Sequence, residues 1–140
     1  MQKYKSYSIM HKIFRILLKR AVNSSLSHQN RSDARVALAF SSWLEEKKYL
    51  EVKTESEAAR EMGIAKEQLA YFCSVNMGKP FKQLRKEYRI MEAKRILKQR
   101  PGISLESLGE IVGIPDKSNF RRQFIEVSGC TPKEWASSKR

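Results

Sequence analysis

The sequence contains little cysteine and histidine and no long apolar run. Its 140 residues include two cysteines, Cys73 and Cys130, which form no CxxC pair, and two histidines, His11 and His28. This scarcity argues against a zinc site or a disulfide framework and leaves little material for acid–base catalysis. No apolar run approaches the roughly 18 residues that a membrane-spanning helix requires. We therefore predict no catalytic residue, no metal ligand and no cofactor, and we do not expect an enzyme.

Acidic residues are scarce as well. The chain has 28 Lys and Arg against 15 Asp and Glu, a formal net charge of +13 and a pI near 10.0. This balance in a small chain points to a polyanion, either nucleic acid or an anionic membrane surface. The excess is concentrated, because residues 1–40 carry a net charge of +7 and residues 81–101 carry +6. Charge that only aids solubility would be spread out, so we predict localised contact with a polyanion.

The first 32 residues differ from the rest of the chain. Residues 1–22 place basic side chains between apolar residues at helical spacing, which predicts an amphipathic helix. Residues 23–33 are rich in Ser and Asn and indicate a linker. We therefore divide the chain into a basic segment with its linker, 1–32, and one domain, 33–140. The helix at 1–22 packs against the domain or a partner helix, is the remnant of a linker from a sensor domain or a juxtamembrane piece, or lies on a membrane surface.

Apolar spacing and capping residues predict a series of helices. These helices run over about 34–49, 55–62, 66–76, 81–100, 104–112, 117–128 and from 131 onward. Thr54 and Glu57 form a capping box, Asp116 is an N-cap, and Gly63 and Gly129 end the helices before them. No segment shows sustained alternation of apolar and polar residues, so we predict an all-α fold.

Several positions recur about 50 residues later in the chain. The matched pairs are Gly63 with Gly113, Leu69 with Phe120, Cys73 with Phe124, and Gly78 with Gly129. Each copy is a short helix, a turn containing glycine and a second helix, which is the pattern of a helix-turn-helix motif. The small residues Ala59 and Gly109 let the two helices of each motif approach closely. We place the first motif at about 54–77, the second at about 104–128, and a joining helix at about 81–100.

The second motif carries a family resemblance. Its sequence, SLESLGEIVGIPDKSNFRRQFIEVSGCTPKEW, spans residues 104–135. It resembles the DNA-binding domain of the AraC/XylS-type bacterial transcription regulators, and the resemblance extends over about 43–135. It implies two homeodomain-like helix-turn-helix subdomains joined by a long central helix, in a cytoplasmic, nucleoid-associated protein that binds specific sequences of double-stranded DNA. The family's sensor domain is absent here, so we expect a stand-alone regulator or the C-terminal piece of a larger one, sensor-fused or membrane-anchored.

The resemblance also places the residues that contact DNA. In the second motif, the outward face of the second helix carries Lys117, Ser118, Asn119, Arg121 and Arg122. The corresponding positions of the first motif are Lys66, Glu67, Gln68, Ala70 and Tyr71. Arginine suits guanine and Asn or Gln suits adenine, whereas Lys117 suits a phosphate. Because Glu67 repels phosphate, we expect the second motif to supply most of the binding energy.

The sequence is also compatible with other interpretations. The cations of the joining helix form a solvated face that raises the local potential, or contact the ligand directly; they include Lys82, Arg85, Lys86, Lys94, Arg95 and Lys98. A peripheral membrane protein held by residues 1–22 is one rival function. An alkyl-accepting repair enzyme using Cys73 is a more distant one. RNA polymerase, and a sensor domain or partner helix at residues 1–22, are further candidate partners, and no small-molecule site is evident.

Overall fold

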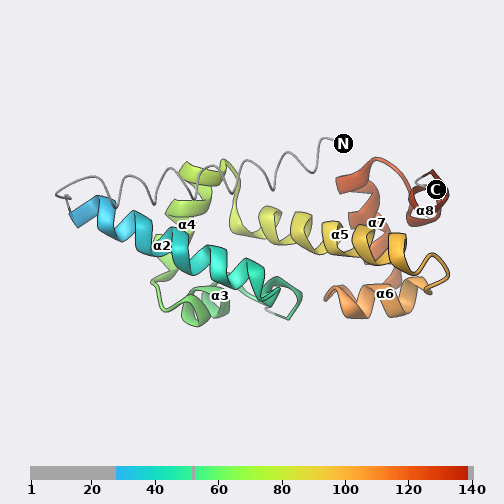
Figure 1. Cartoon of the computed structure of the whole chain (residues 1–140), viewed down its shortest axis with the longest axis horizontal. Helices are drawn as coiled ribbons and strands as arrows, with labels where there is room; N and C mark the ends of the chain where they lie inside the picture. The colour runs from blue at the N-terminus through green and yellow to red at the C-terminus, as the bar shows by residue number, and fades with distance from the viewer. Residues whose placement is uncertain (1–27, 52, 139–140) are drawn as a thin grey trace. The chain divides into compact units, whose positions relative to one another are not determined.

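The computed structural model describes residues 28–51 and 53–138, and all secondary structure in these ranges is helical. The elements in chain order are α2 (His28–Glu45), the 3-10 helix η1 (Lys48–Leu50), α3 (Glu55–Met62), α4 (Lys66–Phe72), the π-helix η2 (Cys73–Met77), α5 (Phe81–Gln99), α6 (Leu105–Ile111), α7 (Lys117–Ser128) and α8 (Pro132–Ser138) (Figure 1). The predicted all-α fold is confirmed. The amphipathic helix predicted at 1–22 lies outside the described residues.

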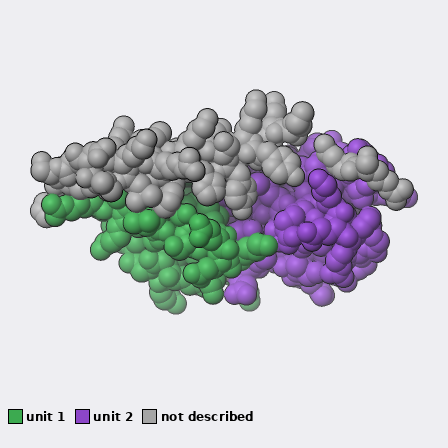
Figure 2. Space-filling view, in the orientation of Figure 1, with its two compact units in different colours: residues 1–48, 53–81 green, residues 49–52, 82–140 purple. Residues whose placement is uncertain are grey.

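The chain divides into two compact units (Figure 2). Unit 1 contains the described residues up to Lys48 together with Lys53–Phe81. Unit 2 contains the described residues of 49–52 and those from Lys82 onward. Each unit contains one of the two predicted helix-turn-helix motifs.

Unit 1 has an aromatic core beneath α2. This helix packs against α3 and α4. The Phe40 ring centroid lies 6.0 Å from that of Trp43 and 5.2 Å from that of Phe72, and the Trp43 centroid lies 5.6 Å from that of Phe81. Trp43 is 4% exposed, and its indole Nε1 donates to Glu61 Oε2 at 3.0 Å. Trp43 is therefore a central residue of the unit 1 core.

Unit 2 is built around the middle and end of α5. Its core joins residues of α5, α6 and α7 and includes Ile90, Ala93, Leu108, Phe120 and Phe124. Trp135 packs against this core from α8 but is only half-buried. The Lys94 ammonium lies 3.7 Å from the centroid of the Trp135 ring, and Trp135 Nε1 donates to the Lys94 carbonyl at 3.4 Å. The cation–π contact and the hydrogen bond of the indole N–H both hold Trp135 in place at the edge of the core.

The predicted helix caps are confirmed. The Thr54 hydroxyl accepts from the Glu57 N–H at 3.1 Å, and the Glu57 carboxylate accepts from the Lys53 and Thr54 N–H groups at 2.9 and 3.3 Å. These backbone donors hold the pKa of Glu57 below its ordinary value. The Asp116 carboxylate accepts from the Asn119 N–H at 2.7 Å. Gly63 ends α3 with φ of 70°, a conformation that glycine adopts without strain.

The linker predicted over 23–33 is wrong for residues 28–33, which are helical and belong to α2. Ser and Asn have modest helix propensity, but tertiary contacts override it. Gln68 of α4 donates to the Ser32 hydroxyl at 3.4 Å, and Ala34 and Val36 are buried. The boundary placed between residues 32 and 33 therefore falls inside a helix.

Two predicted helices end differently from the expectation. The helix expected to reach residue 49 stops at Glu45, since Lys47 has φ of 55° and leaves the helical conformation. The chain then forms η1, where Tyr49 is buried with its ring centroid 5.6 Å from that of Tyr88. The helix expected over 66–76 is α-helical only to Phe72 and continues as the π-helix η2 to Met77.

Candidate nucleic-acid interface

The two helix-turn-helix motifs close through the same backbone hydrogen bond. The Ile64 N–H donates to the Ala59 carbonyl at 3.0 Å, and the Ile114 N–H donates to the Gly109 carbonyl at 2.7 Å. The repeated apolar positions of the second helices, Leu69 and Cys73 in α4 and Phe120 and Phe124 in α7, are all fully buried. The repeat inferred from the sequence is therefore a repeat of structure.

Burial of Phe120 and Phe124 fixes which face of α7 points outward. Lys117, Ser118, Arg121 and Arg122 are exposed, and Asn119 is half-buried. The Asn119 amide oxygen accepts from Arg122 Nη2 at 2.6 Å and from Gln123 Nε2 at 3.1 Å. All five residues predicted for the second motif thus lie on the accessible part of one helix, and Asn119 is pre-oriented by its neighbours.

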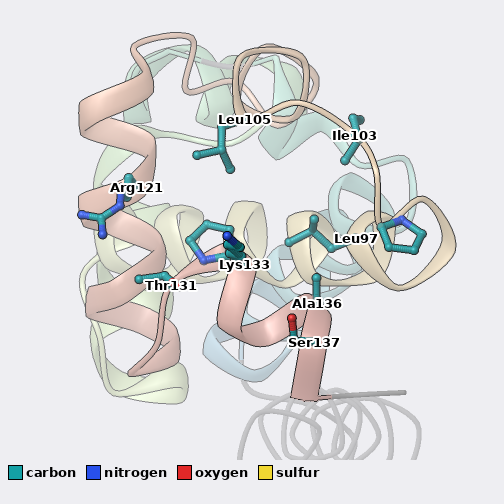
Figure 3. A pocket seen from close by; sticks show the side chains of 10 residues that line it. Leu97, Ile103, Leu105, Arg121, Thr131, Lys133, Ala136 and Ser137 are labelled. Atoms are coloured by element: carbon teal, nitrogen blue, oxygen red, sulfur yellow. The ribbon is translucent and has the colours of Figure 1, made fainter.

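Arg121 and Arg122 line different hollows of unit 2. Arg121 lines an open hollow of about 480 Å³ with apolar residues that include Leu97 and Leu105 and with Lys133 of α8 (Figure 3). Arg122 lines a hollow of about 240 Å³ beside α5. Successive residues of a helix are rotated by about 100° around its axis. The side chains of Arg121 and Arg122 therefore leave α7 in different directions.

Lys117 forms an ion pair with Glu106 of α6. Their charged atoms are 3.0 Å apart, and the side chains are 57% and 59% exposed. The hydrogen bond from Lys117 holds the pKa of Glu106 below its ordinary value. An exposed pair of this kind contributes little to stability. Lys117 can therefore exchange Glu106 for a phosphate at small cost.

The residues of α4 that the sequence predicts to contact DNA include one, Gln68, whose side chain already has hydrogen-bond partners in the protein. Lys66, Glu67, Ala70 and Tyr71 are exposed, with Tyr71 55% exposed. Gln68 is half-buried, and its Oε1 accepts from the Ala65 N–H at 2.9 Å.

The polar ends of Gln68 thus have structural partners. Besides the Ala65 N–H that its oxygen caps, its Nε2 donates to Ser32 of α2. The prediction of base contact did not consider this capping, although a Gln at the third position of a helix is a known capping signal. Gln68 also lines a hollow of about 440 Å³ with Ser32 and Asp33, and Glu67 and Tyr71 line the same hollow. The outward face of α4 thus borders the N-terminal part of α2.

Cys73 does not have the environment of a nucleophile. It is fully buried, and burial, followed by the negative charge of Glu55, raises the pKa of its thiol to about 12. The reactive species of cysteine is the thiolate, which is negligible here near neutral pH. Across residues 28–51 and 53–138, His, Cys, Asp and Glu form no group suited to hold a metal ion. None of the helices described is both long and apolar enough to span a membrane.

Two helix pairs, each closed by a glycine turn and each exposing one face of its second helix, define a helix-turn-helix protein. A family model described as "Helix-turn-helix domain" matches residues 58–138, which is more than half of the chain. The chain belongs to this AraC-type helix-turn-helix family of DNA-binding transcription regulators. The resemblance drawn from the second motif is confirmed, and double-stranded DNA is the partner.

Solved structures share the fold. The C-terminal domain of AraT, a response regulator from Geobacillus stearothermophilus, matches with a TM-score of 0.64 and 18% identity over 83% of this chain and 89% of that one. The C-terminal domain of the two-component response regulator yesN from Fusobacterium nucleatum matches with a TM-score of 0.60 and 23% identity, over 69% and 92%. A DNA-binding transcriptional dual regulator from Escherichia coli K-12 matches with a TM-score of 0.61 and 19% identity, over 83% and 96%. No curated protein sequence matches the chain significantly.

Proposed function

We propose that the chain is a sequence-specific transcription regulator whose helices α4 and α7 enter two successive major grooves of one duplex. The observation that carries the proposal is the row of exposed polar side chains on α7, which lies opposite the buried Phe120 and Phe124. The first turns of such a helix meet base edges in the major groove. DNA binding requires no chemical step, so the function needs no catalytic residue.

The length of α5 supports two grooves for one chain. Its 19 residues, at 1.5 Å each, make a helix about 28 Å long. Successive major grooves on one face of B-DNA are about 34 Å apart. The length of α5 is close to that spacing, so one chain with two recognition helices would do what a dimer does on two half-sites.

Within each recognition helix we assign roles by side-chain chemistry. Arg121 or Arg122 suits the O6 and N7 of guanine, and Asn119 suits adenine. Lys117 and Ser118 suit phosphates. In α4, Lys66 suits a phosphate, Glu67 suits cytosine, and Ala70 and Tyr71 make apolar contact. Gln68 can reach adenine only by leaving its bonds to Ala65 and Ser32.

This assignment makes the two motifs unequal. In α4 the outward face carries the acid Glu67 and a glutamine with structural partners, whereas in α7 it carries Arg121 and Arg122. Arg122→Ala should therefore weaken binding by about 5- to 150-fold, corresponding to about 1–3 kcal/mol for a base contact. Tyr71→Ala should cost clearly less. Equal losses in a fluorescence-anisotropy titration would show that the asymmetry is wrong.

The duplex for this titration comes from selection out of a random pool, followed by footprinting. We expect a protected site in two parts, one helical turn apart, with one chain bound per site. Selected duplexes that share no sequence, or a footprint with only one protected segment, would contradict base recognition by both α4 and α7.

Some predictions lie beyond this proposal. RNA polymerase as a partner and a cytoplasmic, nucleoid-associated location remain predictions. The division of the chain into 1–32 and 33–140 also remains a prediction, although its boundary falls within α2. Two of the similar structures are C-terminal domains of response regulators. That similarity favours, as the second candidate, a C-terminal DNA-binding fragment of a larger regulator, sensor-fused or membrane-anchored. A membrane-surface role for residues 1–22 remains the rival that deletion of those residues would reveal through loss of liposome binding.

A further inference from the structure

A hollow of about 240 Å³ lies between α5 and α7 in unit 2. Five basic side chains line it: Lys82, Arg85, Lys86, Arg89 and Arg122. We call this cluster the basic hollow. It collects half of the eight cations that the sequence places in residues 81–101 and adds one from the recognition helix.

The α5 side of the basic hollow is a single helix face. Residues 82, 85, 86 and 89 follow the i, i+3, i+4, i+7 spacing that aligns side chains along a helix. Leu84 and Tyr88, which lie between them in sequence, are buried. The packing of α5 in its own unit therefore forces these four cations to one side, where α7 contributes Arg122.

Basic side chains outnumber carboxylates among the residues that line the basic hollow. Among the described residues that line it, Glu126 is the one carboxylate, and it pairs with Lys86 at 3.1 Å. The Arg89 guanidinium is held in place by donation from Nε to the Tyr49 carbonyl at 2.7 Å. Burial, followed by the positive charge of Arg85, lowers the pKa of Arg89 to about 10. Repulsion between neighbouring cations is a cost that a bound anion would relieve.

We infer that the basic hollow binds phosphodiester groups of the same DNA duplex whose bases face α7. Arg122 belongs both to the exposed face of α7 and to the basic hollow, so the two surfaces are continuous. The planar guanidinium fork of arginine matches phosphate oxygens in a bidentate arrangement. Helix α5 is then part of the DNA-binding surface as well as the joining helix. This inference rests on the proposed function.

Because phosphate carries no sequence information, binding in the basic hollow adds affinity to every duplex equally. The test compares the double variant Lys82→Gln/Arg85→Gln with the control Lys98→Gln/Arg100→Gln. Both pairs remove two charges, and the control residues are exposed at the far end of α5 and just beyond it. Affinity is measured for the selected duplex and for a shuffled one, at salt concentrations between about 50 and 200 mM.

The first double variant should reduce the slope of log affinity against log salt by about 1.8, or about 30-fold in affinity near 150 mM, for both duplexes. The control pair should change the slope by much less. In addition, Glu126→Gln should tighten binding about five-fold by removing one repulsion of the phosphates, whereas Glu110→Gln, an exposed carboxylate on α6, should not. Circular dichroism verifies that each variant is folded.

Equal slopes for the two double variants, together with equal effects of Glu126→Gln and Glu110→Gln, would overturn the inference. The Glu126 arm remains decisive if the first double variant does not fold. If the unchanged chain binds no duplex, the proposed function itself fails. If it binds a specific duplex but the paired variants behave alike, only the assignment of the basic hollow fails.

Discussion

Gly109 occupies a position where two segments of backbone meet. A Cβ atom built on Gly109 would collide with the carbonyl oxygen of Ile114, and the Gly109 carbonyl accepts the Ile114 N–H. Neither backbone group can move without opening the turn that orients α7. In the first motif the equivalent position is Ala59, which is 2% exposed. The second motif has no methyl group at this position, and its closing hydrogen bond is 2.7 Å long, against 3.0 Å in the first motif.

Gly109→Ala should destabilise the protein in spite of the higher helix propensity of alanine. The collision with the Ile114 carbonyl should lower the free energy of unfolding by about 2 kcal/mol, as overpacking does in well-packed interiors. Gly102→Ala is the control, because nothing lies within 4 Å of a Cβ there; it should change stability by less than about 1 kcal/mol. Urea denaturation measures both. Equal stability of the two variants would mean that the turn yields readily.

The recognition helices α4 and α7 occupy equivalent places in the repeat but begin and continue differently. α7 runs for 12 residues from the side-chain cap Asp116 to Gly129. α4 runs for 7 residues from Ala65, whose own side chain caps nothing, and then widens into η2. The weaker start is offset by Gln68, which turns back to cap the Ala65 N–H. A side chain on the outward face of α4 thus has a structural partner, which is one reason to expect unequal motifs.

Asp116 stabilises α7 as a hydrogen-bond acceptor at its first turn. Asp116→Ala should lower the free energy of unfolding by about 1 kcal/mol because the Asn119 N–H loses its partner. Asp116→Asn removes the same charge but keeps an oxygen that can accept, so it should stay within about 0.5 kcal/mol of the unchanged protein. The measurement is the midpoint of chemical denaturation. If both substitutions cost the same, the charge rather than the cap is what stabilises the helix.

The molecule consists of two units with separate cores. Unit 1 is organised by the rings of Phe40, Trp43 and Phe72, whereas unit 2 is organised by the cluster around Phe120 and Phe124. Each unit has one tryptophan, Trp43 or Trp135, so each can be followed by its own fluorescence. Separate cores allow separate unfolding transitions.

We expect unit 1 to unfold at lower temperature than unit 2, because α4 is short and continues as a π-helix. In the variant Trp135→Phe, the fluorescence of Trp43 should change before the overall loss of helicity is half complete. In the variant Trp43→Phe, the fluorescence of Trp135 should change after that point. Fluorescence and circular dichroism recorded on the same heated sample test this order. Coincident midpoints in both variants would show that the two cores unfold as one.

The sequence alone was sufficient for local features. Caps such as Thr54 and Asp116, the glycine ends of helices and the matched core positions Leu69 and Phe120 all depend on residues within a few positions of one another. Local spacing therefore determines them before any long-range contact forms. The family could be recognised for the same reason, because its pattern in the second motif consists of these capping and turn residues.

Only the tertiary structure decided features that join distant segments. The helical residues 28–33 belong to α2, which packs against α4, and Gln68 of α4 donates a hydrogen bond to Ser32, 36 positions away. The basic hollow likewise joins α5 to α7, and Lys86 and Glu126 are 40 positions apart in the sequence. The helical periodicity of apolar residues shows which positions face away from the core. It does not show which exposed side chains from different helices lie next to one another. That proximity depends on how whole helices pack, and it determines where the positive charge of this protein is gathered.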